Sequence, residues 1–365
     1  MGQSLTEVAQ LLKDIDKKVQ LIYAFNGTGK TRLSREFRLL VAPKNIEDDT
    51  GIKVLYYNAF TEDLFFWDND LNDDVHRRLT IRPNGFTDLV LEFINDQGLD
   101  GRIISNFQHF TNQFLTPIFS PNLSEVEFSI QRGDNENLNN IKISKGEESN
   151  FIWCIFYSLL EQIVEVLSIP EPDERSTNKF DNLKYIFIDD PVSSLDDNHL
   201  IELAVNLAEL IKKSTGLKFV ISTHNPLFYN VIFNELSSKA CYMLNKLEDS
   251  TYDLIEKNGD SNKSFSYHLF IKQTIEEAIT GNNIQKYHFT LLRNLYEKTA
   301  NFLGFPKWSE LLPDDKQTYY NRVIQFTSHS TLSNDVVPEP TEPEKQTVKF
   351  LLDHLNDNFN YWKEV

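Results

Sequence analysis

Residues 24–31 read AFNGTGKT, and this segment decides the fold. The apolar run before it, residues 19–24, predicts a strand, and residues 31–40 have the pattern of a helix. A glycine-rich turn between a strand and a helix is typical of a phosphate-binding loop, because its backbone N–H groups and the helix N-terminus face the phosphate. Ala24 replaces the first glycine of the usual pattern. We expect the phosphate contacts to come from Asn26, Gly27, Gly29, Lys30 and Thr31.

Two further apolar runs end in polar residues that suit nucleotide hydrolysis. Residues 185–188 predict a buried parallel strand that runs into Asp189 and Asp190. We expect Asp189, through water, and the Thr31 hydroxyl to bind Mg²⁺, and Asp190 to orient the attacking water. Residues 219–223 predict another buried strand, which ends at His224, a candidate contact for the outer phosphate.

Taken in order, these segments resemble the Walker A loop, Walker B strand and switch histidine of ABC and SMC-like ATPases. Residues 193–196, ending in Asp196, stand where this superfamily has its D-loop. Ser144 and Gly146, just before a helix expected at residues 150–167, resemble its signature motif. The resemblance implies an α/β ABC-type P-loop NTPase domain.

The same resemblance implies a site shared between chains. A signature motif binds the nucleotide held by another chain, so we expect a head-to-tail dimer or a higher oligomer around ATP or GTP with Mg²⁺. Nucleotide binding would drive the pairing of chains, and nucleotide hydrolysis would let them separate. Besides Ala24, the chain departs from the superfamily in two places. The stretch from Ser144 to Asp189 is longer than usual, and the polar insert 170–181 accounts for the excess. The Q-loop glutamine has two candidate replacements, Asn58 and Glu62.

Composition narrows the class of protein. The chain has 365 residues, enough for about two domains. Hydrophobic residues make up 40% and charged residues 25%, which excludes a disordered or fibrous protein. Two cysteines fit a reducing, cytoplasmic setting. A net charge of −18 argues against non-specific binding along nucleic acid.

Neither a secretory signal nor a membrane span is expected. Charged residues between Lys13 and Lys18 interrupt the first apolar positions. Residues 151–170 are the most apolar stretch, but Glu161 and Glu165 lie within it, so we interpret it as a buried helix of a soluble domain.

The chain changes character between Glu248 and Lys257. We therefore predict domains at residues 1–256 and 257–365, the second mostly α-helical. From Lys257 onward the chain has 12 Lys and Arg residues and 14 Asp and Glu residues, so its charges nearly balance. This part should therefore repel a polyanion less than the rest of the chain does. Helical periodicity predicts helices at residues 267–280, 285–303, 315–326 and 344–362.

Three features stand out in this second domain: the polar segment 257–267, the pair Arg293 and Glu297, and His329. Arg293 and Glu297 are four residues apart on one helix face. From spacing alone they would be an ordinary surface ion pair worth about 0.3–0.5 kcal/mol, and His329 a loop histidine. An antiparallel hairpin of the helices 285–303 and 315–326 would bring His329 back to the pair.

Four segments resemble the PrrC-type bacterial anticodon nucleases, at residues 20–31, 56–65, 189–196 and 257–267. Such proteins join an ABC-like NTPase domain to a C-terminal ribonuclease that cuts tRNA-Lys 5′ to the wobble base. The resemblance implies a nuclease triad of Arg293, Glu297 and His329. It also implies that the segment 257–267 recognises the anticodon through Lys257, Gly259, Asp260, Ser261, Asn262, Lys263, Phe265 and Tyr267.

The resemblance further implies a role in phage defence. A type I restriction–modification complex would hold the nuclease latent, a phage-encoded peptide would release it, and dTTP would act as a further ligand beside ATP or GTP. Residue chemistry is consistent with metal-free cleavage by the RNA 2′-OH, with Glu297 and His329 as acid and base in either order and Arg293 on the developing charge. Phe265, Tyr267 and Tyr287 could stack on unpaired bases.

Two alternatives compete with this interpretation. The chain could be a DNA-repair or DNA-sensing ATPase of the SMC or RecF kind with no nuclease of its own, although its acidic charge and the absence of a long coiled coil argue against that. It could also be a toxin-like ATPase whose effector is a separate protein.

Overall fold

A computed structural model describes residues 2–43, 51–70, 73, 76–111, 113–131, 137–191, 197–237, 239–247, 249–257, 267–327 and 340–359. The chain divides into two compact units, Met1–Ser264 and Phe265–Val365. Strand β11 (Tyr252–Glu256) pairs with β10 (Lys239–Lys246), so residues up to Glu256 belong to the first unit.

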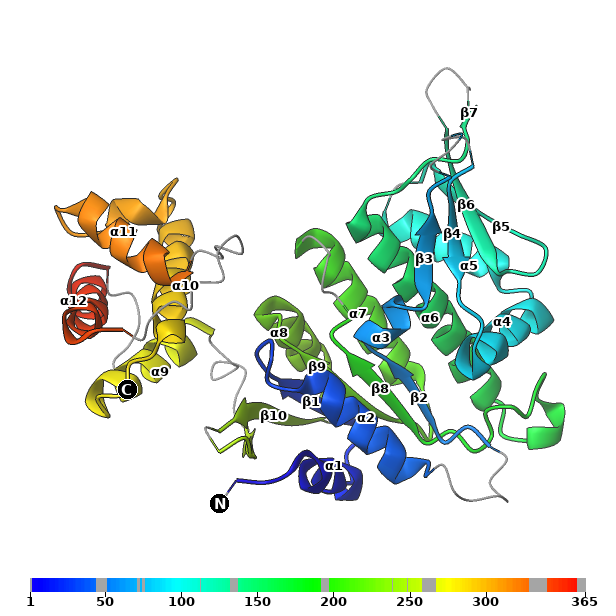
Figure 1. Cartoon of the computed structure of the whole chain (residues 1–365). Helices are drawn as coiled ribbons and strands as arrows, with labels where there is room; N and C mark the ends of the chain where they lie inside the picture. The colour runs from blue at the N-terminus through cyan, green and yellow to red at the C-terminus, as the bar shows by residue number, and fades with distance from the viewer. Residues whose placement is uncertain are drawn as a thin grey trace. The chain divides into compact units, whose positions relative to one another are not determined.

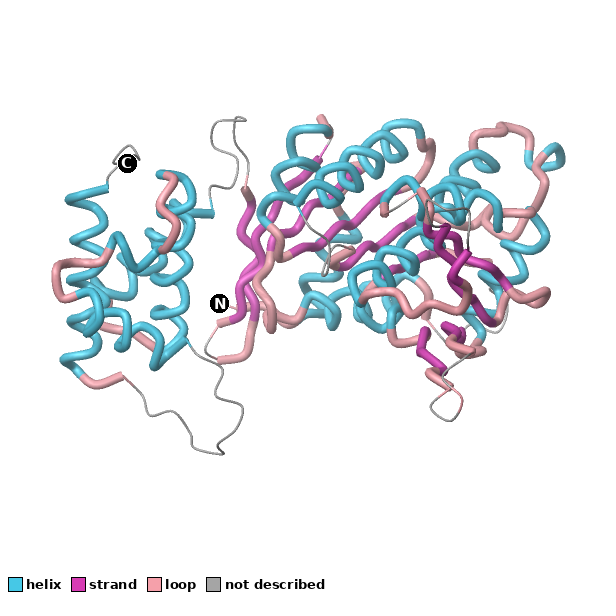
Figure 2. The backbone as a smooth tube through the Cα atoms, turned by 90° about the horizontal axis from the view of Figure 1, so that it is seen from above, coloured by secondary structure: helices cyan, strands magenta, loops and turns pink. Residues whose placement is uncertain are grey.

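The first unit is built on a six-stranded sheet in the order β11-β10-β1-β9-β8-β2 (Figures 1 and 2). All neighbouring strands are parallel except β11, which is antiparallel at one edge. The central strands are almost wholly buried, which explains why their sequences are continuous apolar runs. The remaining strands are β1 (Val19–Tyr23), β2 (Val54–Tyr57), β8 (Tyr185–Asp189) and β9 (Lys218–Thr223).

Helices cover both faces of this sheet (Figure 1). Ile22 of β1 packs into a buried apolar cluster with residues of α1 (Leu5–Asp14) and α2 (Lys30–Val41) on one face. The next residue, Tyr23, points to the other face, where its ring meets Tyr229 of α8 (Pro226–Glu235) edge-on at 5.8 Å. Helix α7 (Asp197–Lys213) packs beside α8.

A second, antiparallel sheet in the order β3-β4-β6-β5, with β7 on β6, was not predicted from the sequence. Its aromatic face packs on α6 (Lys145–Leu167): Phe151 lies 5.1 Å from Phe128 of this sheet. The short strand β7 pairs with β6, with Leu138 opposite Ile130. The strands are β3 (Phe65–Asp68), β4 (Arg78–Ile81), β5 (Leu115–Phe119), β6 (Glu125–Gln131) and β7 (Asn137–Leu138), and the nearby helices are α3 (Ala59–Glu62), α4 (Gly85–Gln97) and α5 (Asp100–Phe110).

Helix α6 begins at Lys145, five residues before its expected start. Of the helices in the described residues, it alone is long and apolar enough to cross a membrane, and 78% of its most apolar window is buried inside the protein. That burial is typical of the core helix of a soluble domain. A single turn of 3₁₀-helix, η1 (Pro172–Glu174), follows α6 within the polar insert 170–181.

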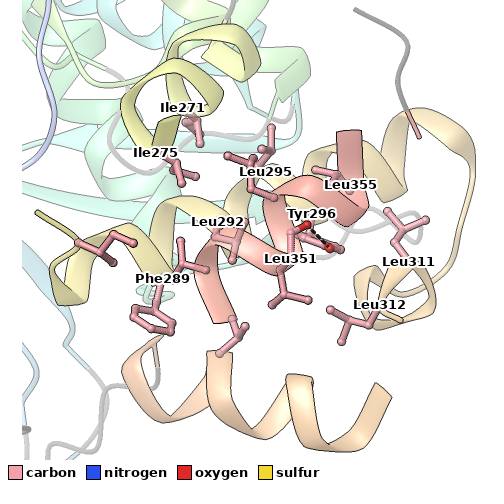
Figure 3. Close-up of a cluster of buried hydrophobic side chains, with 14 of the residues drawn as sticks. Ile271, Ile275, Phe289, Leu292, Leu295, Tyr296, Leu311, Leu312, Leu351 and Leu355 are labelled. Carbon is pink, nitrogen blue, oxygen red and sulfur yellow. Dashed lines mark hydrogen bonds between the residues drawn. The ribbon is translucent and has the colours of Figure 1, made fainter. Parts of the chain in front are cut away.

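Every regular element among the described residues of the second unit is a helix: α9 (Tyr267–Thr280), α10 (Lys286–Leu303), the 3₁₀-helix η3 (Trp308–Leu311), α11 (Lys316–Thr327) and α12 (Glu342–Phe359). Its own apolar core gathers residues from all of them (Figure 3). The Tyr296 hydroxyl on α10 donates a 2.9 Å hydrogen bond to the backbone oxygen of Leu351 on α12. Gly304, at φ 80°, ends α10 in the left-handed conformation that favours glycine.

Candidate functional site

The phosphate-binding loop, the paired carboxylates and His224 follow the carboxyl ends of β1, β8 and β9. Strand β9 lies between the other two, with Tyr23 opposite Thr223 and Asp189 opposite Ser222. Open parallel sheets bind ligands beyond the carboxyl ends of their strands. The topology therefore gathers these motifs, up to 200 residues apart in sequence, at one edge.

The loop between β1 and α2 has the backbone that its glycines allow. Gly27 has φ 80° and Gly29 has φ 109°, a region that other residues rarely adopt. Gly29 is the N-cap of α2. The Lys30 side chain is buried under the loop, where its Nζ donates to the backbone oxygen of Ala24 at 3.1 Å and lies 3.3 Å from Asp190 Oδ2.

Asp189 is buried and bound by two hydroxyl groups. Thr31 Oγ1 donates to its Oδ2 at 2.7 Å, and Ser222 Oγ donates to its Oδ1 at 2.6 Å. Burial raises the pKa of Asp189 above its ordinary value, although both hydrogen bonds oppose that shift. Thr31 and Asp189 thus present adjacent oxygens of the kind Mg²⁺ prefers.

Asp190 stands at the end of β8 with φ 55°, a left-handed conformation that aspartate tolerates better than most residues. It accepts hydrogen bonds from Thr223 Oγ1 at 3.1 Å and from the backbone N–H of His224 at 3.2 Å. The Nδ1 atom of the His224 ring lies 2.5 Å from its Oδ2. Burial alone would raise the pKa of Asp190, but the His224 hydrogen bond and the positive charge of Lys30 outweigh it and lower the pKa.

A cavity of about 410 Å³ opens at this edge, with the two glycines, Lys30, Thr31 and both carboxylates in its wall. This wall suits a nucleotide phosphate with Mg²⁺. The loop backbone and the lysine would contact the phosphate, and the hydroxyl and carboxylate oxygens suit the metal. No group of three or more His, Cys, Asp or Glu side chains in the described part of the chain could hold a metal by itself. A metal held jointly by protein oxygens and phosphate needs no such group.

Of the two candidates for the Q-loop position, Glu62 lines this cavity. Its carboxylate accepts hydrogen bonds from Tyr57 Oη at 3.2 Å and from Ser149 Oγ of α6 at 3.3 Å, and burial raises its pKa. Asn58 is fully buried and donates to Ser34 Oγ at 3.2 Å instead. Ser222 and Thr223 also belong to the site but were not predicted from the sequence. Their position directly before His224 is the signal that could have identified them.

Ser144 is the N-cap of α6, so the signature-like residues form the first turn of this helix. Its Oγ accepts from the backbone N–H of Glu147 at 3.2 Å, and Glu147 Oε2 accepts from the Ser144 N–H at 2.7 Å. This capping box accounts for Ser144 locally. Gly146 lies within the same turn, whereas the D-loop residue Asp196 is outside the described residues.

In the second unit, Arg293 Nε donates a 2.7 Å hydrogen bond to Glu297 Oε1 on α10. The two side chains are 33% and 35% exposed, so the ion pair is accessible to a ligand. His329 lies outside the described residues, as do most of the expected recognition residues: Gly259, Asp260, Ser261, Asn262, Lys263 and Phe265. Lys257 is described, and its backbone N–H donates to the Cys241 oxygen at 2.7 Å.

Comparisons with known proteins agree with these features. A family model described as an AAA domain matches residues 118–344. The curated "Anticodon nuclease" of Escherichia coli is 58% identical over 100% of this chain and 99% of the relative.

Among solved structures, this chain is similar to the SMC head domain from Thermotoga maritima. The two are 13% identical, the match covers 66% of this chain and 91% of that chain, and the TM-score is 0.31. It is also similar to cbiO1 from Clostridium perfringens, part of the ABC transporter complex cbiONQ. These two are 13% identical, the match covers 72% of this chain and 82% of that chain, and the TM-score is 0.33. At these TM-scores neither structure supports a conclusion about this chain. The full-length relative and the domain match do: the chain belongs to the PrrC-type anticodon nucleases, a family of enzymes that carry an NTPase domain.

Proposed function

We propose that this anticodon nuclease cleaves tRNA-Lys 5′ to the wobble base, with Arg293, Glu297 and His329 as its catalytic residues. The observation that carries the proposal is the accessible 2.7 Å ion pair of Arg293 and Glu297 on α10. A carboxylate held beside a guanidinium offers a proton-transfer group and a cation at one place, and RNA cleavage needs both. The strong similarity to the E. coli relative supports this choice over a DNA-sensing ATPase without a nuclease.

The reaction follows from the RNA itself. A base removes the proton of the ribose 2′-OH, the 2′ oxygen attacks the adjacent phosphorus, and an acid protonates the leaving 5′ oxygen. Arg293 stabilises the charge on the phosphoryl oxygens. Glu297 and His329 supply the base and the acid in either order. The products are a 2′,3′-cyclic phosphate and a 5′-hydroxyl, and no metal takes part in this step.

Recognition of the anticodon is proposed for the segment 257–267, with Asp260 in it. In the first unit, ATP or GTP with Mg²⁺ would bind between Lys30, Thr31, Asp189 and Asp190, and the cavity lined by these residues supports this. Mg²⁺ would supply charge neutralisation of the phosphates. Asp190 would hold the attacking water, and His224, bound to Asp190, would face the outer phosphate.

Regulation is proposed on the pattern of the family. The chain would pair head to tail or form a higher oligomer, with Ser144 and Gly146 of one chain on the nucleotide of another. In the cytoplasm a type I restriction–modification complex would hold it latent until a phage-encoded peptide releases it, and dTTP would be a further ligand. Cleavage of host tRNA then stops phage protein synthesis.

End chemistry tests the proposed function. The purified chain is incubated with total tRNA, ATP or GTP and Mg²⁺, and the RNA ends are sequenced after treatment that requires either a cyclic phosphate or a 5′-hydroxyl. We expect one dominant cut in tRNA-Lys with a 2′,3′-cyclic phosphate. A 5′-phosphate product, or cuts spread over many RNAs, would refute the proposal.

A further inference from the structure

The second unit contains a cavity of about 640 Å³, which lies within the roughly 300–1,000 Å³ range of ligand sites. Its wall is formed by the end of α10, by η3 and by the start of α11. The wall residues that matter here are Glu297, Asn301, Lys307, Trp308, Lys316 and Tyr320. Of these residues, only Glu297 belongs to the ion pair with Arg293.

The cavity continues the face of α10 that carries the ion pair. Arg293, Glu297 and Asn301 are spaced four residues apart, so they form one stripe along the helix. Each step is about 6 Å along the helix axis, and Glu297 belongs both to the ion pair and to the cavity wall. A ligand that reaches the ion pair and extends along this stripe therefore enters the cavity.

Two aromatic rings in the wall form a stacked pair. Trp308 and Tyr320 have ring centroids 5.2 Å apart with an angle of 21° between the planes. Both side chains are half-buried, and Trp308 also meets Tyr296 of the apolar core edge-on at 6.2 Å. Anchored aromatic rings at the edge of a core are a stacking platform for unpaired nucleic-acid bases.

Two exposed lysines stand in the same wall. Lys316 Nζ donates to the backbone oxygen of Glu310 at 3.1 Å, and an ammonium group has three protons to donate, so further donors remain. Lys307 precedes Trp308 directly, and its side chain is also exposed. Cations beside aromatic rings are the combination that binds single-stranded nucleic acid, whereas an apolar groove for a protein helix would lack them.

We propose that this cavity binds a nucleotide of the RNA substrate next to the scissile phosphate. The unstacked base packs against the Trp308 and Tyr320 pair, and a neighbouring phosphate contacts Lys316 and Lys307. The proposal rests on the proposed nuclease role of Arg293 and Glu297, since their position makes the cavity a continuation of the active site.

The test measures RNA binding by the full chain with fluorescence anisotropy. The probe is a labelled stem–loop that carries the tRNA-Lys anticodon loop, with a 2′-deoxy residue at the cut position so that it cannot be cleaved. Tyr320→Leu is compared with Tyr319→Leu. Tyr319, the adjacent residue, stacks on Phe350 of α12 instead, at 5.4 Å and 28°, and does not line the cavity.

We expect Tyr320→Leu to raise the Kd of the stem–loop roughly 5- to 100-fold, the usual effect of losing one base stack, and Tyr319→Leu to change it less than twofold. Lys316→Gln should reduce the slope of log K against log salt by about 0.7, whereas Lys349→Gln on α12 should not. Lys316 is on the surface, so this second variant decides the matter if Tyr320→Leu fails to fold.

Cleavage and binding measurements together distinguish loss of the nuclease role from loss of the RNA-binding role of the cavity. If the parent chain cuts tRNA-Lys and all four variants bind the stem–loop equally, the nuclease stands and the cavity is not an RNA site. If the parent cuts no tRNA but Tyr320→Leu and Lys316→Gln still weaken binding, the cavity binds RNA and the catalytic assignment is wrong. Unchanged RNA binding together with loss of a protein partner would assign the cavity to that partner and overturn the proposal.

Discussion

Lys30 Nζ lies 3.3 Å from Asp190 Oδ2, so the lysine of the phosphate-binding loop after β1 is paired with a carboxylate that follows β8, the next strand but one in the sheet. The same carboxylate binds the ring and the backbone N–H of His224. A nucleotide phosphate must therefore compete with Asp190 for Lys30. These contacts connect the loop, the carboxylate and the histidine into one unit, and we expect a bound nucleotide to change them.

Lys30→Ala should abolish nucleotide hydrolysis, because it removes the cation that reaches the outer phosphate. Loss of such a group costs about 10²- to 10³-fold in kcat. A phosphate-release assay measures it. The control is Lys212→Ala, which breaks an ion pair with Glu235 at 2.8 Å on the surface. Equal loss in both variants would show that the effect is structural.

The two adjacent aspartates should have opposite effects on stability. Asp189→Asn removes a buried charge whose pKa is raised by burial, so we expect the free energy of unfolding to stay the same or rise. Asp190→Asn removes the acceptor of Lys30 and His224 and should lower the free energy of unfolding by about 1.5–3 kcal/mol. Denaturant titration at pH 7 measures both. The same sign for both variants would contradict the assigned environments.

At low pH, Asp190→Asn should no longer lower the free energy of unfolding. The pKa of Asp190 is lower in the folded protein than its ordinary value of 3.8, so its charged form stabilises the fold above that pH. The contribution is lost as the pH falls through the lowered folded pKa. We expect the difference in unfolding free energy between parent and variant to shrink progressively below pH 3.8. A difference that grows on acidification would reverse the sign and refute the pairing.

Nucleotide should control the association of chains. Mass photometry with and without ATP and Mg²⁺ should show more dimers or higher oligomers when nucleotide is present. Ser144→Asp should block this shift: aspartate is as good an N-cap as serine, so α6 keeps its cap, but the new charge repels a phosphate. An oligomeric state that is the same with and without nucleotide would exclude this control of association by nucleotide.

The sequence predicted the core of the nucleotide-binding sheet because its signals are local. Buried parallel strands are continuous apolar runs, and β1, β8 and β9 end within one residue of their expected limits. The helices α10 and α11 also begin and end within one residue of expectation. Helical periodicity was sufficient there.

The antiparallel sheet could not be predicted in the same way. Its strands β3 and β4 have four residues each, too few for alternation to stand out. The contact of the sheet with α6, Phe128 on Phe151, joins residues far apart in sequence. The early start of α6 was missed because Ser144 and Glu147 cap each other, a pattern interpreted only as a nucleotide motif. The Trp308 and Tyr320 stack joins residues from η3 and α11, which no local pattern reveals.

We propose that one chain carries two separable activities, and two assays on the same preparations test this most directly. Arg293→Ala, Glu297→Ala and His329→Ala are each assayed for cleavage of tRNA-Lys and for nucleotide hydrolysis. Since the Arg293–Glu297 pair is one-third exposed, its loss should cost the fold little. We expect cleavage to fall about 10²- to 10⁴-fold with hydrolysis near the parent level. Cleavage at the parent rate in any of the three variants, or loss of both activities together in folded protein, would contradict the account.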